Sequence, residues 1–275
     1  MLGYGFGENN LSGSMYELYA IKYGERVGTR GAIFIGGDPH DAPLPMDYFI
    51  WAIRNEDRVI VVDTGYSQED GEARGRTFLQ SPAAGLESIG IDPAEVDDVI
   101  ISHMHYDHAG NLGLFPNARF HIQAVEMAFA TGRGITFGVL RHSFTVDHAV
   151  DMVRANFADR VTYYHGDGDV APGVKVHFIG GHAPGLQAVS VETGRGRVVL
   201  AADAAHYYES IFKERAFQTH VHMPGMLEGF RTLRRLAPND SHIIPGHDPD
   251  VLRRYPSASP MTDGMIVRLD GPELG

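Results

Sequence analysis

Apolar and polar positions predict strands through most of the chain. Residues 16–23 alternate loosely, and the apolar runs 48–54 and 58–63 flank a polar turn at 55–57, which predicts a hairpin. Further strands are expected at 99–102, 119–123, 174–179, 188–191, 198–202 and 242–244.

Helices are expected where apolar spacing follows the helical period, at 125–131, 146–158 and 226–237. Pro82 and Gly90 bound a shorter helix at 82–89. Hairpins early in the chain, followed by strands that alternate with helices, favour an α+β fold with sheets covered by outer helices. Segment 132–164 carries no metal-type motif and is interpreted as a small helical cap, a common place for substrate selection.

The composition supports a packed core and narrows the choice of partners. Hydrophobic residues make up 43% of the 275 residues, a length that allows one large domain or two small ones. A formal net charge of −12 without a basic stripe argues against nucleic acids and anionic membranes as partners. The absence of cysteine removes disulfides, thiolate ligands and a cysteine nucleophile.

Two observations bear on location. Residues 1–14 are rich in glycine and lack the basic and apolar regions of a signal peptide. No apolar run approaches the ~18 residues of a spanning helix. We therefore expect a cytoplasmic protein.

Candidate chemistry is concentrated directly after the apolar run 99–101. His103, His105, Asp107 and His108 fall within six consecutive positions. A strand that ends in a tight loop can direct several such side chains into one small volume. Imidazole and carboxylate together are typical ligands of a divalent metal ion, so this segment predicts a metal site.

The same arrangement recurs once before this motif and three times after it. Each time a potential ligand follows a predicted strand and is flanked by Gly or Pro, which permit a sharp turn. These positions are Asp63 in Asp-Thr-Gly, His182 in Gly-Gly-His-Ala-Pro-Gly, Asp203 after 198–202, and His247 in Pro-Gly-His-Asp. Strand ends from distant parts of a chain can meet at one rim, so we expect these residues to join the first motif.

The combination of His-x-His-x-Asp-His, Gly-His-x-Pro-Gly, a strand-terminal Asp and a late Gly-His resembles the metallo-β-lactamase superfamily, from about Tyr48 to Asp248. The resemblance implies an αββα sandwich as a single domain over residues 1–275, with two divalent metal ions between the sheets and Zn²⁺ as first candidate. It implies that one metal is held by His103, His105 and His182, the other by Asp107, His108 and His247, and that Asp203 bridges them. Asp63 would steady the ligand loop.

Within the superfamily the chain is most similar to the N-acyl-homoserine lactonase branch, in the Pro-rich segment 38–48, the ligand spacing and the cap. That branch has a Tyr three positions after the bridging Asp, where it contacts the substrate carbonyl. Here that position is His206, followed by Tyr207 and Tyr208. We expect His206 or Tyr207 to contact substrate, with a loop histidine and packing tyrosines as the alternatives. A homodimer is compatible with the resemblance.

The expected reaction is the opening of a small lactone, N-acyl-homoserine lactone being one candidate. Two metal ions that share a water lower its pKa from ~15.7 toward ~7, so a bridging hydroxide can attack the ester carbonyl. Asp107 would shuttle the proton, and His206 or Tyr207 would donate to the developing oxyanion.

Two other activities use the same ligands. One is hydrolysis of a thioester or another ester, as in glyoxalase II. The other is di-iron redox chemistry, although those proteins carry an additional flavodoxin-like domain. Two side features also have open alternatives. His220 and His222 are a second metal site or structural histidines, and Phe129, Phe137 and Phe144 line an acyl pocket or fill the core of the cap.

Overall fold

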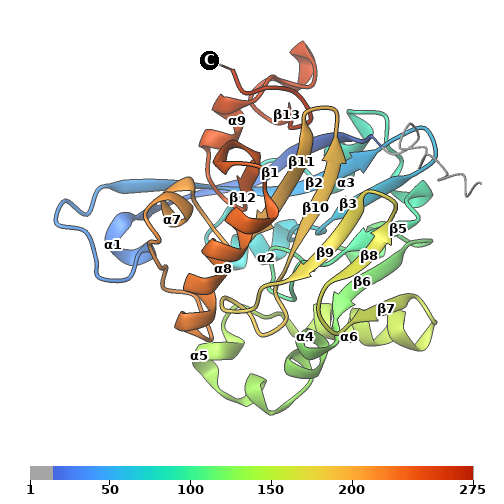
Figure 1. Cartoon of the computed structure of the whole chain (residues 1–275). Coiled ribbons are helices and arrows are strands. Elements are labelled where there is room, and N and C mark those ends of the chain that lie inside the picture. Colours follow the sequence, from blue (N-terminus) through green and yellow to red (C-terminus); the bar gives the residue numbers. More distant parts are fainter. Residues whose placement is uncertain (1–14, 275) are drawn as a thin grey trace, which may run out of the picture.

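Two β-sheets face each other in the middle of the molecule, and helices lie on both outer sides (Figure 1). The computed structural model describes residues 15–274, so residues 1–14, on which the expected lack of a signal peptide rests, lie outside the described part. Among the described residues the larger sheet has eight strands and the smaller has five.

The larger sheet follows the order β13-β1-β2-β3-β5-β6-β7, and β4 pairs with β1. Its strands are β1 (Glu17–Thr29), β2 (Pro43–Arg54), β3 (Val59–Val62), β4 (Thr77–Phe78), β5 (Asp98–Ile100), β6 (Arg119–Gln123), β7 (Val161–Tyr164) and β13 (Ile266–Arg268). The smaller sheet, in the order β12-β11-β10-β9-β8, contains β8 (Gly168–Ala171), β9 (Val174–Phe178), β10 (Gln187–Thr193), β11 (Gly196–Ala202) and β12 (Ile243–Pro245).

The helices lie between these strands along the chain. They are α1 (Arg30–Ile33), α2 (Gln68–Ala73), α3 (Pro82–Glu87), α4 (Ala124–Ala130), α5 (Gly138–Arg141), α6 (Val146–Phe157), α7 (Tyr208–Phe212), α8 (Met223–Leu236) and α9 (Asp250–Arg254). None of the helices in residues 15–274 is both long enough and apolar enough to cross a membrane.

Alternation along the strands explains the layered core. Trp51 of β2 lies in the cluster between the sheets, where it is buried with Val189 of β10. Its neighbour Ile50 points to the opposite face and belongs to the cluster that also contains Leu86 of α3. Because successive strand residues point to opposite faces, β2 packs against the other sheet on one side and against helices on the other. The αββα sandwich expected from the sequence is therefore confirmed.

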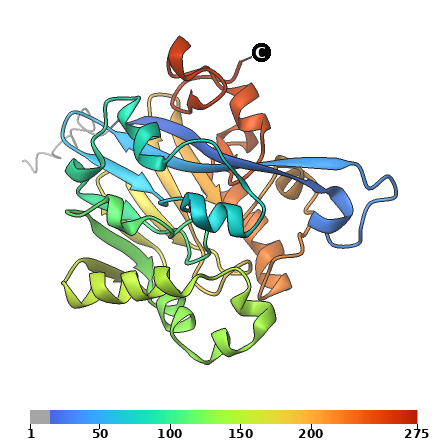
Figure 2. The ribbon, with the colours of Figure 1, turned by 180° about the vertical axis from the view of Figure 1, so that it is seen from behind.

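The predicted elements are found, and the differences lie mostly at their ends. The expected hairpin corresponds to β2 and β3, which pair antiparallel. Both strands flanking the first connection are longer than expected, because β1 runs to Thr29 and β2 starts at Pro43. This ribbon carries α1 and projects from the body of the molecule (Figures 1 and 2). Prolines within a strand normally argue against one, which is why the sequence did not predict the extension.

The expected cap lies beside the sandwich as α5 and α6 with the turn Arg133–Thr136. The last residues of segment 132–164 form β7, which pairs in parallel with β6 at the edge of the larger sheet. The helical part thus ends at Phe157, and the division into one domain with an inserted cap stays a prediction.

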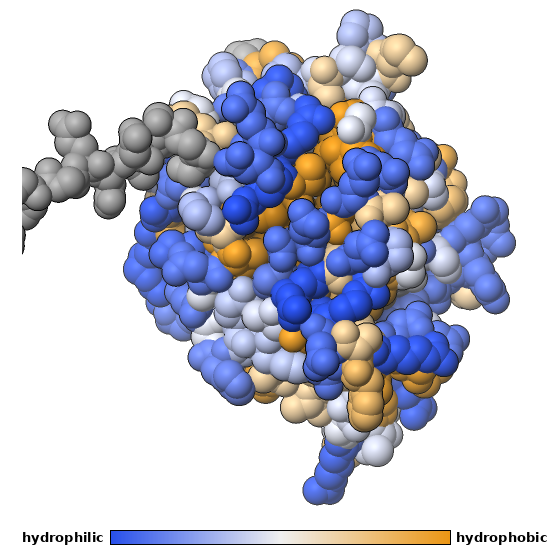
Figure 3. Space-filling view, turned by 90° about the vertical axis from the view of Figure 1, so that its right-hand side faces the viewer, coloured by the Kyte–Doolittle hydropathy of each residue, from blue (hydrophilic) through white to orange (hydrophobic). Residues whose placement is uncertain are grey.

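The face of the molecule that is seen in Figure 3 is mostly hydrophilic, with a band of apolar side chains between the hydrophilic ones.

Candidate metal centre

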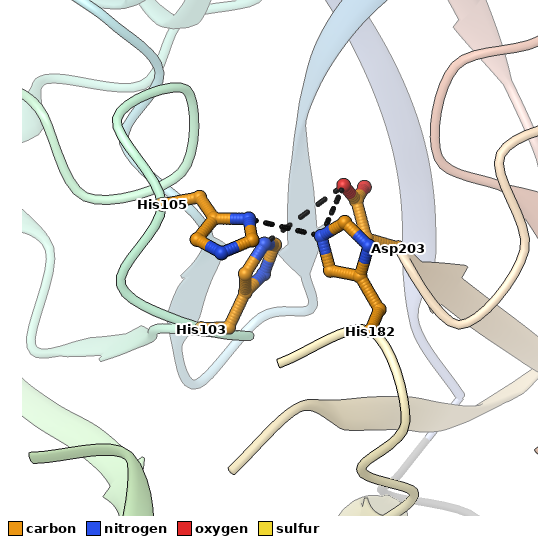
Figure 4. A group of neighbouring side chains, drawn as sticks. All are labelled: His103, His105, His182 and Asp203. Carbon is orange, nitrogen blue, oxygen red and sulfur yellow. Dashed lines mark hydrogen bonds and ion pairs between the residues drawn. The ribbon is translucent and has the colours of Figure 1, made fainter. Parts of the chain in front are cut away.

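Loops that follow strand ends bring the predicted ligands together at one edge of the sandwich. One group consists of His103, His105, His182 and Asp203, which point toward one another (Figure 4). His103 and His105 share one loop, whereas His182 and Asp203 come from two others. A second group consists of Asp107, His108 and His247. In each group the potential ligand atoms all lie within 4.8 Å of one another, and every residue is buried.

Asp203 divides its two carboxylate oxygens between the groups. Its Oδ2 atom lies 3.1 Å from Nε2 of His182, in the first group. Its Oδ1 atom lies 2.9 Å from Nε2 of His247 and 3.3 Å from Nε2 of His108, in the second group. Asp203 follows Ala202, whose φ of 44° lies in the left-handed region that alanine rarely adopts. Such a backbone is typical of a functional site, and it turns this carboxylate toward both groups.

Three of the imidazoles are fixed by acceptors on the side away from the cluster. The pairs are His108 Nδ1 with Asp63 Oδ2 at 2.7 Å, His182 Nδ1 with the carbonyl of Thr219 at 2.7 Å, and His247 Nδ1 with the carbonyl of Asp47 at 2.8 Å. Each acceptor requires the ring proton on Nδ1. The Nε2 lone pairs therefore face the cluster, as metal-binding histidines require.

Several buried atoms of the cluster lack a hydrogen-bond partner, which tests whether a metal fits. They are Nε2 of His103, Nε2 of His108 and Oδ1 of Asp203. In addition, Nδ1 of His105 faces Nε2 of His182 at 2.9 Å. Unpartnered buried polar atoms cost free energy unless something satisfies them. Nitrogen lone pairs and a carboxylate aimed into one volume suit divalent cations, so the residues present fit the expected metal ions.

Electrostatics favours the metal-binding protonation states of His103, His105 and Asp203. Burial, followed by the neighbouring imidazoles, holds the pKa of His103 and His105 well below the ordinary value. Burial alone would raise the pKa of Asp203, but the imidazoles around it, His247 first, hold that pKa well below its usual range. Neutral imidazoles and an ionised carboxylate are the forms that bind metal. Burial would lower the pKa of His108 and His247, but the Asp203 carboxylate beside them raises both, so these two imidazoles would lose a proton when a metal binds.

Asp63 supports the ligand loop in the way expected from the sequence. Its Oδ1 accepts the backbone N–H of Ser102 at 2.7 Å, and its Oδ2 accepts the hydroxyl of Ser102 at 2.8 Å as well as His108. The backbone of Asp63 has a φ of 62°, a conformation that aspartate tolerates better than most residues. One buried carboxylate thus holds both the start of the loop and one of its histidines.

The two other predicted catalytic residues, His206 and Tyr207, have different surroundings. His206 joins the site, because its Nε2 lies 3.0 Å from Oδ2 of Asp203 and its ring stacks on Phe217 at 3.7 Å. Burial is the main cause that lowers the pKa of His206 to about 4, so it is neutral at neutral pH and has a single N–H. The hydroxyl of Tyr207 instead donates to the carbonyl of Pro45 at 3.2 Å. That contact favours the packing interpretation of Tyr207, and both catalytic roles stay predictions.

Sequence reasoning missed Glu126, which is fully buried in the first turn of α4. Its carboxylate accepts the backbone N–H of Met104 at 2.9 Å and that of Gly185 at 2.7 Å. These residues lie in two different ligand loops. A signal was available, because Glu126 is the only charged residue in the run 124–130 and comes directly after a strand, as the ligands do.

A pocket of about 400 Å³ adjoins the first group. His105 and His182 form part of its wall, and the cap and the loop before α8 complete its lining. The lining residues are His105, Gly138, Val139, Leu140, His142, Ser143, His182, Gln218, Thr219, His220 and Val221. Phe144 of the cap packs edge-on against the ring of His105 at 4.9 Å and lies 5.7 Å from Phe129. The cap therefore contacts a metal-ligand candidate directly.

The histidines before α8 have structural contacts. Nδ1 of His220 lies 2.9 Å from the carbonyl of Gln218, and Nδ1 of His222 accepts the backbone N–H of Gly225 at the start of α8. Within residues 15–274 neither belongs to a group of three potential ligands. These contacts favour the structural interpretation of both.

Comparison with known proteins agrees with this geometry. A family model described as the metallo-beta-lactamase superfamily matches residues 45–255. The chain belongs to this superfamily.

Individual relatives give more detail. The N-acyl homoserine lactonase AttM of Azorhizobium caulinodans is 33% identical over 188 residues, covering 64% of this chain and 66% of AttM, slightly less than two thirds of that relative. The N-acyl homoserine lactonase AiiA of Bacillus thuringiensis subsp. kurstaki is 25% identical over 228 residues, covering 74% of this chain and 82% of AiiA. A solved N-acyl homoserine lactone hydrolase with the product N-hexanoyl-L-homoserine at its catalytic metal centre shares the fold at a TM-score of 0.72 and 22% identity, covering 87% of this chain and 96% of the other.

Proposed function

We propose that this chain is a dinuclear metal-dependent hydrolase that opens a small lactone, with N-acyl-homoserine lactones as the first substrates to test. The observation that carries the proposal is Asp203, whose two oxygens face two separate groups of imidazole nitrogens. Membership of the metallo-beta-lactamase superfamily and similarity to proteins named N-acyl homoserine lactonase support it.

The proposed centre has two metal positions. His103, His105 and His182 would hold one divalent ion, Asp107, His108 and His247 would hold the other, and Asp203 would bridge them. A set rich in imidazole and free of thiolate favours Zn²⁺. When bound, two such ions would activate a water molecule as nucleophile and polarise the ester carbonyl.

The chain's own side chains handle the proton and the charge around it. Oδ2 of Asp107 lies 3.6 Å from Nε2 of His108, and Asp107, although buried, is the most exposed of the seven candidate ligands at 7%, so it would both ligate and pass a proton toward solvent. His206 holds Oδ2 of Asp203 through its single N–H. It would donate to an oxyanion only when that bond is released, because its Nδ1 carries no second proton.

The pocket beside His105 and His182 would receive the acyl side of the substrate. Val139 and Leu140 supply apolar surface from the cap, while Ser143 and Gln218 supply polar groups. Such a mixture suits an amide-linked acyl chain, which needs one polar contact and an apolar wall. A homodimer and a cytoplasmic location, expected from the sequence, remain part of the proposal.

Purified protein should contain two divalent ions per chain by elemental analysis. It should release acid from a panel of lactones in a pH-stat, and Asp203→Asn should not. A preference for thioesters over every lactone would favour the glyoxalase II type of activity instead. Iron without acid release from any ester would indicate redox chemistry and contradict the proposal.

A further inference from the structure

The buried carboxylate of Glu126 connects two ligand loops that are far apart in the sequence. Met104, whose N–H it accepts at 2.9 Å, lies between His103 and His105. Gly185, whose N–H it accepts at 2.7 Å, lies in the loop that carries His182. All three histidines of the first group therefore lie on segments held by one side chain.

We propose that Glu126 is a positioning residue that sets the spacing of the first metal position by holding the loop of His103 and His105 against the loop of His182. The inference rests on the dinuclear centre proposed above. Both hydrogen bonds of Glu126 are to backbone N–H groups, and Glu126 itself does not line the pocket, so we expect it to act through the backbone of these loops. Its charge also interacts with His182, an interaction that the Glu126→Asp variant keeps.

The packing around Gly185 shows how close this contact is. A Cβ atom at position 185 would lie 2.4 Å from Cβ and 2.6 Å from the backbone nitrogen of Glu126. Real Cβ atoms do not approach so closely, so only glycine lets the loop of His182 reach the carboxylate. The Gly-His-x-Pro-Gly motif thus ends in a glycine that the Glu126 contact requires.

The hydrogen bonds of Glu126 add to others that join the same two segments of the two sheets. The backbone N–H of Gln187 donates to the carbonyl of Ser102 at 3.0 Å, and the Gln187 side chain donates to the carbonyl of Ile101 at 2.9 Å. These bonds join the segment that follows β5 to the start of β10. Glu126 joins them again beyond the strand ends, where the histidines project and no ladder holds the chain.

The second metal position has its own supports. His108 is oriented by Asp63 and His247 by the backbone of Asp47, and neither support involves Glu126. Loss of Glu126 should therefore weaken one metal position selectively. Loss of a group that orients metal ligands typically costs about 10- to 100-fold in affinity.

The chemistry of the carboxylate suggests the variants. Both partners of Glu126 are N–H donors, so a group that only accepts is required. Glu126→Gln keeps the shape but turns an NH₂ group toward one of the N–H groups. Glu126→Asp keeps the charge but is one methylene too short to reach both loops. Asp98→Asn is a matched control, because that carboxylate, at the start of β5, pairs with His121 at 2.8 Å and contacts neither ligand loop.

The test measures metal rather than turnover. The protein and its variants are loaded with Co²⁺, titrated with a chelator, and followed by elemental analysis and by the visible absorption of bound Co²⁺. His105→Ala and His247→Ala provide reference spectra for loss of the first and of the second position. In Glu126→Gln and Glu126→Asp we expect one ion to be lost at about 10- to 100-fold lower chelator concentration than in wild type, leaving the spectrum of His105→Ala. Asp98→Asn should follow wild type.

Several results would overturn the inference. Retention of both ions by Glu126→Gln would do so, as would a residual spectrum like that of His247→Ala. Wild-type behaviour of Glu126→Asp would mean that charge, and not the bridge, matters. If Glu126→Gln does not fold, Gly185→Ala separates the same loops and should show the same selective loss. A wild-type protein that binds fewer than two ions would refute the dinuclear centre itself, whereas two ions in wild type with no change in the variants refutes only the role of Glu126.

Discussion

Nδ1 of His108 lies 2.7 Å from Oδ2 of Asp63, and this contact determines which nitrogen of His108 faces the metal centre. A carboxylate accepts the ring proton on Nδ1 and leaves the Nε2 lone pair for a cation. The same carboxylate accepts two hydrogen bonds from Ser102, at the point where the ligand loop leaves β5. Position and tautomer of one ligand are thus controlled together.

Asp63→Asn should therefore invert the tautomer of His108. Asparagine tolerates the left-handed backbone at this position, so the fold should survive. Its amide oxygen can accept from Ser102, which turns the NH₂ group toward Nδ1 of His108 and drives the ring proton to Nε2. We expect metal affinity at the second position to fall by about 10- to 100-fold. Chelator titration with elemental analysis measures this, and undiminished retention of both ions would contradict the assignment.

Asp203→Asn should affect both positions at once, because each oxygen of Asp203 serves a different group. An amide offers one oxygen and one NH₂ group, so it cannot face two cations. We expect hydrolytic turnover to fall by more than about 100-fold, beyond the cost of losing a group that only orients a ligand. Metal content should fall as well. Turnover like that of wild type with full metal content would refute the bridge.

The sequence predicted those parts of the fold and site that depend on local pattern. The hairpin of β2 and β3, the ligand loops and the helices α3, α4, α6 and α8 carry their signal in neighbouring residues, whereas the short helices α1, α2, α7 and α9 were not predicted. The extension of β1 and β2 was missed because Pro43 and Pro45 lack the N–H that a strand normally uses, and a sequence does not reveal which strands are edges.

Contacts made by backbone carbonyls could not be predicted from the sequence, for a different reason. The carbonyls of Thr219 and Asp47 orient His182 and His247, but any residue type offers a carbonyl. Their role depends on how distant loops pack, which no spacing rule encodes. The difference between His206 and Tyr207 has the same origin, because it depends on which way the chain turns after Asp203.

Gly181 should be intolerant of any side chain. Its φ is 81°, and a Cβ atom there would lie 2.4 Å from the backbone nitrogen of Met226 at the start of α8. Gly181→Ala should lower the free energy of unfolding by about 2 kcal/mol or more, because alanine pays about 1–2 kcal/mol for this backbone before the clash is counted. Urea unfolding of the metal-free protein measures the change. Gly194→Ala, in a turn with open space, is the control, and equal effects of the two would contradict the argument.

The ion-pair network around Arg30 should stabilise the fold at neutral pH and lose this effect at acidic pH. Arg30 contacts Asp38 at 2.7 Å and Glu209 at 2.8 Å, tying the projecting ribbon to α7. The hydrogen bond from Arg30 is the main cause that lowers the pKa of Asp38 to about 2. Since this folded-state pKa lies below the unfolded value, the contribution is fully present above about pH 4 and is lost as the pH falls toward 2.

Arg30→Gln should therefore lower the urea midpoint at pH 6, and its difference from wild type should shrink as the pH is lowered to 2.5. Lys213→Gln removes an exposed partner of Glu209, 3.4 Å away, and should change little at any pH, as expected for a surface pair. A gap between Arg30→Gln and wild type that is constant with pH would show that the network is not the cause.

Leu140 offers a test of the pocket that leaves the metal ligands untouched. It is half-buried on α5 and lines the pocket beside His105 and His182. Leu140→Trp should fill part of the space proposed for the acyl chain. We expect KM to rise several-fold for long acyl chains and to change little for short ones. Each methylene that stays in water instead of being buried costs about 0.8 kcal/mol of binding free energy. The kcat and the metal content should stay the same, because only binding common to ground and transition state is removed. Val150→Trp, on the exposed side of α6 and outside the pocket, is the matched control. If both variants changed KM alike for short and long chains, the acyl group would bind elsewhere.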